Sequence, residues 1–286
     1  MKYAFMRAHE HEFGVRRMCR VLGVSSSGYY EWLVRPQSPR ALRDELLLTH
    51  IRRVHATSHQ AYGAKKTWIE LKAQGVPCGK HHVARLRRSE GIEARRKRRF
   101  RTKARYQQIA AAPNLIAQRF HAGLRDRLWV GDTTFIQTRA GALHLAVLLD
   151  VHARRVVGWA LSPRQDLELV LGALRMALRQ RQPSPGLIHH TDQGSVYSAQ
   201  LYREALQIHG LQASMSAKGV PHDNAVAESF FSTLKNELVH HCTFATRDSA
   251  YQALSDYIEL FYNRRRRHQS LGYVSPIDFE ARSGVA

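Results

Sequence analysis

The sequence predicts two fold classes in one chain: an all-α N-terminal part and a mixed α/β domain after it. Three observations support this division. Up to about residue 93, apolar residues recur at helical spacing. From about residue 123, they alternate with polar residues or form short continuous runs, as they do in strands. A strongly basic stretch lies between the two patterns, and 286 residues are enough for about two domains.

The composition indicates a polyanionic partner. The chain has 44 Lys and Arg against 23 Asp and Glu, a net charge of +21. Nucleic acid is the first candidate. No membrane partner is expected, because no apolar run reaches about 18 residues. Three scattered cysteines without a C-x-x-C pair argue against a disulfide framework and a zinc finger. We therefore expect a cytoplasmic, nucleoid-associated protein.

Residues 1–36 are expected to form a helix-turn-helix-like module. The segment VRRMCRVLGVSSSGYYEWL reads as a helix, a turn at Gly23 and a second helix capped by Ser25 or Ser26. A plain helical hairpin with a core of aromatic residues is the alternative. Three nearby arginines favour DNA contact: Arg16, Arg17 and Arg20.

After a proline-containing linker at 35–40, residues 41–93 are expected to form a second helix-turn-helix-like, DNA-binding module. AYGAKKTWIELKAQG is an amphipathic helix that ends at a glycine, and KHHVARLRRSEG follows as the candidate recognition helix. The alternative is a basic helix face that contacts only solvent. The outward-facing basic residues of the last helix are Lys80, Arg85, Arg87 and Arg88.

Residues 94–122 are expected to be a basic linker. The run RRKRRFRTKAR at 95–105 has eight Lys or Arg in eleven positions. Mutual repulsion prevents such a run from packing as core, whereas contact with phosphates would order it. A solvated charged surface is the alternative. The candidate DNA contacts are Arg95, Arg96, Lys97, Arg98 and Arg99.

Residues 123–245 are expected to form the α/β catalytic core. The pattern predicts strands at 128–138, 144–150 and 154–161, a helix at 166–179, a strand at 185–192, a helix at 198–210, a strand at 213–216 and a final helix. This order, βββαβαβα, is that of a ribonuclease-H-like domain, a mixed five-stranded sheet with flanking helices.

Three acidic residues are the candidate catalytic and metal-binding site. Asp132 lies in the first strand, Asp192 ends the fourth, and Glu228 lies in the last helix, with 59 and 35 residues between them. One aspartate at a strand end is usually structural. Three converging carboxylates repel each other unless divalent ions bridge them. Two Mg²⁺ ions, with Mn²⁺ as a substitute, would activate the attacking oxygen and stabilise the leaving oxygen of a phosphodiester.

Further residues are expected to lie at this site or to contact DNA. Lys235 is seven residues after Glu228 and therefore on the same helix face, and Asn224 shares that face. Asp150 is expected to be a strand-end polar group near the cleft. Residues 246–286 are expected to be a basic C-terminal segment, with a helix at 248–262. Its four consecutive arginines would contact DNA or form a charged helix end: Arg264, Arg265, Arg266 and Arg267.

These motifs resemble those of a known family. DTTFI, HHTDQGSVY, SMSAKGVPHDNAVAESFFSTLKNEL and YNRRRRHQSLGYVSP are similar to segments of the DDE transposases of the IS-three insertion-sequence family, relatives of retroviral integrases. The resemblance is to the B-frame product and covers nearly the whole chain. It assigns the catalytic acids to Asp132, Asp192 and Glu228, and a basic residue to Lys235.

The resemblance implies a bacterial transposase that cuts DNA and transfers a 3′-hydroxyl end to target DNA. Its implied partners are the double-stranded DNA of the element ends and of the target, other copies of the chain when bound to DNA, and an upstream A-frame protein or a fusion with it. Three alternatives stay open: a catalytically silent DNA-binding regulator, half of a frameshift fusion that is inactive alone, and a nuclease that hydrolyses without joining.

Overall fold

The structure is a computed structural model that describes residues 1–95, 112–116, 123–216 and 224–283. The chain divides into two compact units, Met1–His50 and Ile51–Ala286. Within the described residues, no helix is both long enough and apolar enough to cross a membrane.

The first unit contains three short helices, α1 (Lys2–Ala8), α2 (Val15–Leu22) and α3 (Ser26–Val34), and the start of α4 (Pro39–Thr57). Gly23 ends α2 in the left-handed conformation, and the Ser25 side chain accepts a hydrogen bond from the Gly28 backbone at 3.0 Å. The expected helix, turn and helix are therefore present. Helix α4 begins within the segment expected to be a linker, because Pro39 in the first turn loses no helical hydrogen bond.

In the second unit, the end of α4 is followed by α5 (Ala64–Ala73) and α6 (Lys80–Ser89). Helices α5 and α6 pack against each other. Their apolar core includes Leu71, Val83 and Leu86, each at most 2% exposed. The helical spacing of these residues is thus explained by a buried interface.

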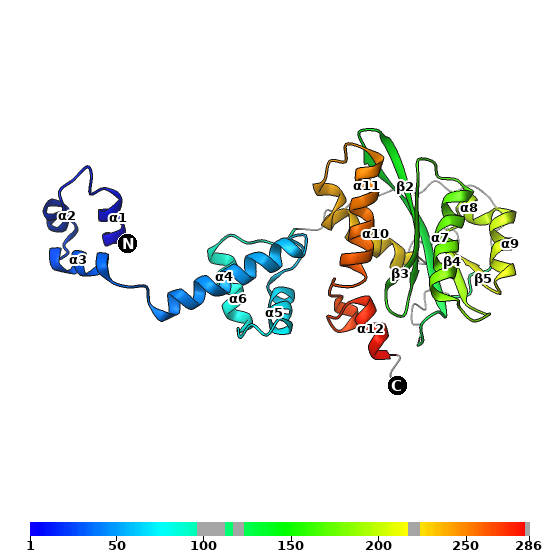
Figure 1. The fold of residues 1–286 in the computed structure, drawn as a ribbon, viewed down its shortest axis with the longest axis horizontal. Helices are drawn as coiled ribbons and strands as arrows, with labels where there is room; N and C mark the ends of the chain where they lie inside the picture. Colours follow the sequence, from blue (N-terminus) through cyan, green and yellow to red (C-terminus); the bar gives the residue numbers. More distant parts are fainter. Residues whose placement is uncertain (96–111, 117–122, 217–223, 284–286) are drawn as a thin grey trace. The chain divides into compact units, whose positions relative to one another are not determined.

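A five-stranded sheet forms the centre of the second unit (Figure 1). It has the order β3-β2-β1-β4-β5. Strands β1, β2 and β3 pair antiparallel, whereas β4 and β5 join in parallel to β1. The predicted mixed five-stranded sheet is confirmed. The bounds of the strands are Leu128–Thr138, Gly141–Asp150, Arg155–Ser162, Ile188–Thr191 and Gln212–Met215, for β1 to β5.

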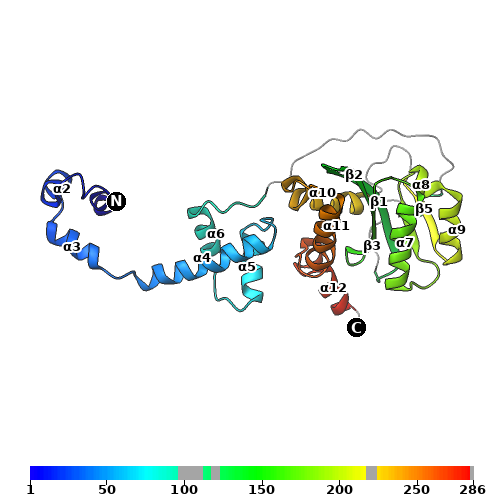
Figure 2. The ribbon, with the colours of Figure 1, turned by 45° about the horizontal axis from the view of Figure 1, so that its top comes forward.

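Helices cover both faces of this sheet (Figures 1 and 2). Helix α7 (Leu167–Arg181) packs against β2 and β3, and α10 (Ala225–Glu237) packs against β1 and β2 from the other side, next to α11 (Arg247–Ser255). Short α8 (Ser195–Ser198) precedes α9 (Gln200–Ile208), which packs on β5.

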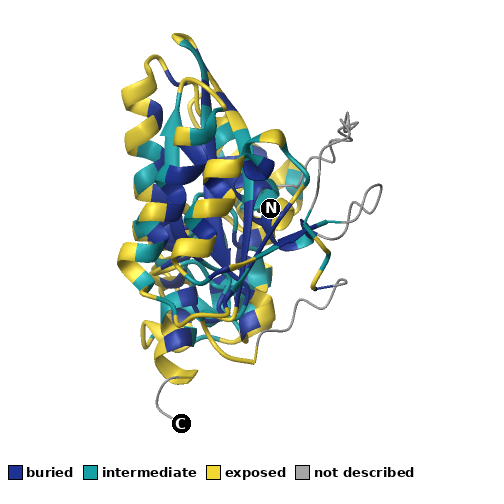
Figure 3. Ribbon diagram, turned by 90° about the vertical axis from the view of Figure 1, so that its right-hand side faces the viewer, coloured by how far each residue is buried: buried dark blue, intermediate teal, exposed yellow. Residues whose placement is uncertain are grey.

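The continuous apolar run of β2 follows from this double cover. Its residues from 145 to 149 are fully buried, and the sheet is the dark centre of Figure 3. At Gly158 on β3, an added Cβ would lie 2.2 Å from the Ala173 carbonyl oxygen of α7. Glycine therefore allows α7 to approach the sheet closely.

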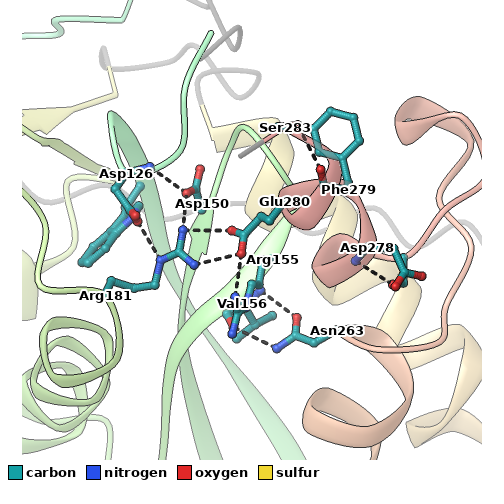
Figure 4. A network of polar contacts seen from close by, with 12 residues as sticks. Asp126, Asp150, Arg155, Val156, Arg181, Asn263, Asp278, Phe279, Glu280 and Ser283 are labelled. Carbon is teal, nitrogen blue, oxygen red and sulfur yellow. Dashed lines mark hydrogen bonds and ion pairs between the residues drawn. The ribbon is translucent and has the colours of Figure 1, made fainter. Parts of the chain in front are cut away.

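The C-terminal segment packs onto the sheet. It contains α11, a π-helical segment (Asp256–Tyr262) and α12 (Pro276–Ser283), with 3-10 turns at Val239–His241 and Gln269–Leu271. The Asn263 side chain accepts from the Val156 backbone N–H and donates to its carbonyl, at 3.0 and 2.9 Å (Figure 4). These bonds give the backbone N–H and carbonyl of Val156, on the edge strand β3, the partners that no neighbouring strand supplies. The sequence predicted a separate basic segment at 246–286, whereas in the structure residues 246–283 pack against the sheet domain.

Candidate active site

Asp132 and Asp192 occupy matching positions on neighbouring parallel strands. The register of β1 and β4 pairs Leu128 with Ile188 and Val130 with His190, an offset of 60 residues. The same offset leads from Asp132 to Asp192, which directly follows β4. Neighbouring strands are about 4.8 Å apart. The sheet therefore places the two carboxylates side by side.

Helix α10 brings Glu228 to the same place. Glu228 lies in its first turn, and the helix packs against β1. At the N-cap, the buried Asn224 side chain donates to the Gly131 carbonyl at 3.1 Å, one residue before Asp132. This bond fixes the start of α10 beside β1. The expectation that Asn224 contacts DNA is wrong, because its side chain is only 6% exposed and anchors the helix.

The electrostatics of the site show that Asp132 is affected by both other acids. Burial, together with the charges of Asp192 and Glu228, raises the pKa of Asp132 to about 7, and the charge of Lys235 opposes this rise. The Thr133 N–H donates to the Asp132 carboxylate at 2.7 Å, which opposes this rise. Excess negative charge is thus concentrated at Asp132.

Asp192 is held in a similar way. The Gly194 N–H donates to its carboxylate at 3.0 Å, and partial burial nevertheless raises the pKa of Asp192. Both aspartates therefore sit on rigid backbone next to β1 and β4. Each keeps a carboxylate oxygen whose charge the surrounding backbone offsets only in part.

The donor set fits a hard divalent cation. Three carboxylates supply only oxygen ligands, as Mg²⁺ prefers, and a cation would offset the charge that raises the pKa of Asp132. Across the described ranges, no three His, Cys, Asp or Glu side chains are gathered closely enough to form a ready cation site. Glu228 is exposed on its helix. Asp132 and Asp192 are therefore the fixed pair, and Glu228 is the side chain that would complete the set.

Lys235 faces the same site. Its ammonium lies 5.5 Å from the centroid of the exposed Phe135 ring, three residues after Asp132 on β1. Burial lowers the pKa of Lys235, and the negative charge of Asp132 opposes that shift. A cation is thus placed beside the carboxylates, where a phosphate of a substrate would approach.

Some predicted DNA contacts lie on the surface. Arg85 and Arg88 are exposed on α6, and Arg264 and Arg265 are exposed after the π-helical segment. Arg95 is half-buried and donates to the Glu237 carbonyl at 3.0 Å. The remaining members of the basic run lie outside the described residues: Arg96, Lys97, Arg98 and Arg99.

Other predicted contacts are engaged inside the protein. Arg87 is 4% exposed and donates to the Thr67 hydroxyl at 3.1 Å, so the expectation that it contacts DNA is wrong. The guanidinium of Arg266 is bound by the Glu237 carboxylate, with N–O distances of 2.8 to 3.1 Å. It is therefore not the exposed DNA contact that was expected.

Arg267 is also held by its own fold. It pairs with the Glu70 carboxylate of α5 and donates to the Tyr273 carbonyl at 3.0 Å. Only part of its side chain, 17%, is exposed. Of the four consecutive arginines, two therefore face solvent and two tie the C-terminal segment to neighbouring elements.

Asp150 lies away from the acids. It is fully buried at the end of β2, paired in register with Trp129 rather than with Asp132. Its carboxylate accepts from the backbone N–H groups of Asp126 and His152 at 2.8 and 2.9 Å, and Arg181 lies 3.3 Å away (Figure 4). Asp150 is a strand-end polar group, as expected, but it belongs to a buried ion network and does not lie near the cleft.

The sequence reasoning missed Tyr197 of α8. Its hydroxyl is buried and has no hydrogen-bond partner among the described residues. Burial raises its pKa, with smaller contributions from Tyr202, Asp132 and Asp192. Tyr197 therefore lies next to the aspartates. Its place in HHTDQGSVY, five residues after Asp192, was the only signal in the sequence.

Comparison with known proteins places the chain in a family. The family description "Integrase core domain" matches residues 124–221, a second model with the same description matches 228–283, and "HTH-like domain" matches 41–100. The first match covers the sheet with α7 to α9, the second covers most of α10 and the C-terminal helices, and the third covers the α4–α6 region.

Curated relatives match along almost the whole chain. An uncharacterized 31 kDa protein of insertion element IS600 from Shigella sonnei is 43% identical over 263 residues, 92% of this chain and 97% of the relative. Transposase InsF of insertion sequence IS3A from Escherichia coli (strain K12) is 40% identical over 287 residues, 98% of each chain. Among solved structures, the HTLV-2 integrase catalytic core domain in complex with magnesium is similar at 16% identity and a TM-score of 0.43, over 55% of this chain and 97% of that one. The chain belongs to the IS3 family of insertion-sequence transposases, which are DDE-type enzymes with an integrase core domain.

Proposed function

We propose that Asp132, Asp192 and Glu228 hold two Mg²⁺ ions, which Mn²⁺ can replace, and that this site cuts DNA strands at the element ends and joins their 3′-hydroxyls to target DNA. The observation that carries the proposal is the raised pKa of Asp132, to which both other acids contribute. Asp192 at a strand end and Glu228 on a helix thus act on Asp132 within a strand, although no single local motif contains the three acids.

The residues of the site have distinct tasks. The backbone N–H groups of Thr133 and Gly194 fix the two aspartates, and Glu228 closes the set from the first turn of α10. Bound ions would supply Lewis acidity toward the attacking and leaving oxygens of the phosphodiester. Binding of a cation displaces the proton that the Asp132 carboxyl keeps near neutral pH.

Lys235 orients the substrate in this proposal. Its ammonium lies beside the carboxylates and packs over Phe135, so it can bind a non-bridging phosphate oxygen next to the reacting group. Direct transfer from one phosphodiester to another conserves the bond energy, so neither ATP nor a covalent enzyme–DNA intermediate is required.

The partners follow from the basic surface and the helical modules. We propose double-stranded DNA of the element ends and target, contacted by exposed Arg85, Arg88, Arg264 and Arg265 and by the basic run at 95–99. Bringing two DNA ends together requires several copies of the chain on DNA. An upstream A-frame protein or a fusion with it, and a cytoplasmic, nucleoid-associated location, complete the proposal.

The triad variants Asp192→Asn and Glu228→Gln test it. Each should abolish Mg²⁺-dependent strand cleavage and joining on a duplex carrying an element end, and leave binding to that duplex within about twofold, because a neutral amide is a poor ligand. Glu168→Gln is the matched control, since Glu168 is an exposed acid on α7 that pairs with Arg175.

The products separate this proposal from its rivals. Joined strands on a supplied target duplex are expected from the wild-type chain. Free 3′-hydroxyl ends without joined product would indicate a hydrolytic nuclease, and DNA binding without either product would indicate a regulator or a chain inactive without its fusion. Retained joining in Asp192→Asn or Glu228→Gln would remove that residue from the site.

A further inference from the structure

A pocket of about 450 Å³ lies beside α10 on the second unit. Its wall is formed by α5, the turn between β2 and β3, α10 and the segment after the π-helical region. All its lining residues belong to Ile51–Ala286. The residues that matter for its chemistry are Lys66, Arg154, Ser229, Thr233 and Arg266. The volume is within the range of ligand-binding sites in proteins.

The pocket carries positive charge without matching acids. Lys66 and Arg154 are half-buried, and neither forms an ion pair with any residue of the described chain. The Lys66 ammonium lies 5.4 Å from the Tyr62 ring centroid. Arg266 lines the same pocket, but Glu237 neutralises it. Two cations from different elements are therefore held around one hollow.

Such an arrangement has a cost without an anion. Burial and the nearby Arg266 lower the pKa of Lys66 to about 8, although the charge of Glu237 opposes this shift, and burial lowers the pKa of Arg154. Removing a cation from water is unfavourable unless an opposite charge compensates for it. The lining contains no acidic side chain. The fold therefore holds two cations in the place where an anion would stabilise both.

The remaining lining selects the kind of anion. The hydroxyls of Ser229 and Thr233 on α10 add neutral hydrogen-bond donors to the two cations. A tetrahedral phosphate group offers several acceptor oxygens in different directions, which suits donors that come from three elements. A planar carboxylate would use fewer of them.

The position of the pocket indicates the source of the phosphate. Ser229 directly follows Glu228, so it is rotated by about 100° around the helix from the catalytic acid. The pocket and the active site therefore occupy neighbouring faces of α10. A DNA strand whose reacting phosphate lies at Asp132 and Asp192 passes close to the pocket with an adjoining part of its backbone.

We propose that this pocket binds a backbone phosphate of the DNA strand that the catalytic acids process, through Lys66, Arg154, Ser229 and Thr233. The inference rests on the proposed function for the identity of the strand. It assigns a phosphate-binding role to two cations outside the basic runs of the sequence. Arg266 contributes as part of the wall, because its charge is already paired.

The test uses Lys66→Met and Arg154→Gln in the full chain. Each keeps the approximate length of the side chain and removes its charge. We expect DNA affinity to fall about five- to twentyfold, and the slope of log K against log salt to decrease by about one for each variant. Arg179→Gln is the control, because Arg179 is an exposed arginine on α7, which covers the other face of the sheet from α10.

A neutral-linkage scan locates the phosphate. A duplex series with one methylphosphonate at successive positions is bound to wild type and to both variants. At one position, the neutral linkage should weaken DNA binding by wild type. At the same position it should have little further effect on DNA binding by Lys66→Met or Arg154→Gln, and a double-mutant cycle measures this coupling. Additive losses at every position, or losses equal to that of Arg179→Gln, would overturn the proposal.

Two further measurements complete the test. Thermal unfolding without DNA should show that both variants are at least as stable as wild type, since each lacks a cation that has no ion-pair partner among the described residues. Strong destabilisation of both variants would assign Lys66 and Arg154 a structural role instead. If inorganic phosphate stabilises wild type and not the variants, but the scan finds no coupled position, the pocket binds a free anion and not DNA. The neutral-linkage scan measures DNA binding and does not depend on strand joining. The pocket proposal and the catalytic proposal can therefore fail separately.

Discussion

Asp132 and Asp150 lie on neighbouring strands of one sheet and share a physical property, but they have opposite tasks. Burial raises the pKa of both, to about 7 for Asp132 and to about 6 for Asp150. The carboxylate of Asp150 receives two backbone N–H groups and the Arg181 guanidinium. Asp132 receives one backbone N–H and faces the charges of Asp192 and Glu228.

The difference between the two aspartates shows what makes a buried carboxylate functional here. Around Asp150 the protein supplies the counter-charge itself, with Glu280 and Asp126 sharing the same arginine (Figure 4). Around Asp132 the neighbouring acids add negative charge, which Lys235 offsets in part, and we expect a bound cation to supply the rest. The first arrangement stabilises the fold, whereas we expect the second to bind cations at the expense of stability.

The largest expected effect is on catalysis at Asp132. Asp132→Asn should lower strand joining by about a thousandfold or more, because a lost metal ligand removes several kcal/mol of transition-state stabilisation. The same change should leave the melting temperature unchanged or raise it. Joining assays and thermal unfolding of the same preparation measure both. A large fall in melting temperature would show that Asp132 is structural, like Asp150.

Asp150→Asn should show the reverse pattern. Replacing the buried carboxylate leaves Arg181 with less compensation and should lower the free energy of unfolding by about 3 kcal/mol. Joining by the fraction that remains folded should be near normal. Denaturant unfolding, with activity measured well below the midpoint, checks this. Loss of activity in a fully folded variant would contradict the assignment and bring Asp150 back to the active site.

The pH dependence of stability sharpens the comparison. The folded-state pKa of Asp132 is raised, so its contribution to stability is present at acid pH and is lost as pH rises from about 4 through about 7. Mg²⁺ competes with the proton, so the rise in melting temperature caused by Mg²⁺ should grow from about pH 6 to about pH 8.

The Asp150 carboxyl should titrate at lower pH, in the window from about 4 to about 6, and Mg²⁺ should not affect it. Melting curves of wild type, Asp132→Asn and Asp150→Asn across this range, with and without Mg²⁺, separate the two contributions. A Mg²⁺ effect that persists unchanged in Asp132→Asn would show that the ion binds elsewhere.

The smallest expected effect concerns Lys235, whose charge acts on Asp132. Lys235→Ala should reduce joining roughly ten- to a hundredfold through loss of a charge-assisted bond to phosphate, with little change in stability. Lys235→Arg keeps the charge and should restore part of the activity. Unchanged joining with normal DNA binding in Lys235→Ala would remove this residue from the site.

The sequence was sufficient for the order of strands because hydrophobic periodicity reports burial directly. The continuous run at Leu145–Leu149 and the polar break at Asp132 both reflect a sheet covered on two faces. The three acids were found through their spacing and a family resemblance. Their convergence became visible only through the 60-residue register of β1 and β4 and the anchoring of α10 by Asn224.

The sequence was a poor guide to individual basic residues. Arg87 looks like its exposed neighbours in LRRS, but Thr67, twenty positions earlier, receives its hydrogen bond inside the core. Arg266 looks like Arg265, but its partner Glu237 is 29 residues away. Partners this distant along the chain cannot be read from local charge. The same reason hid Lys66 and Arg154, which no basic run contains.

The Arg181 network also determines the order in which a growing chain can complete its fold. Glu280 is translated 99 residues after Arg181, and Asn263 is translated 107 residues after the strand edge at Val156 that it satisfies. At a synthesis rate of roughly 5–20 residues per second, each delay is on the order of ten seconds. During that interval the edge of β3 lacks its cover, so a nascent chain has time to pair that edge with a chaperone or another copy before its own last helix arrives.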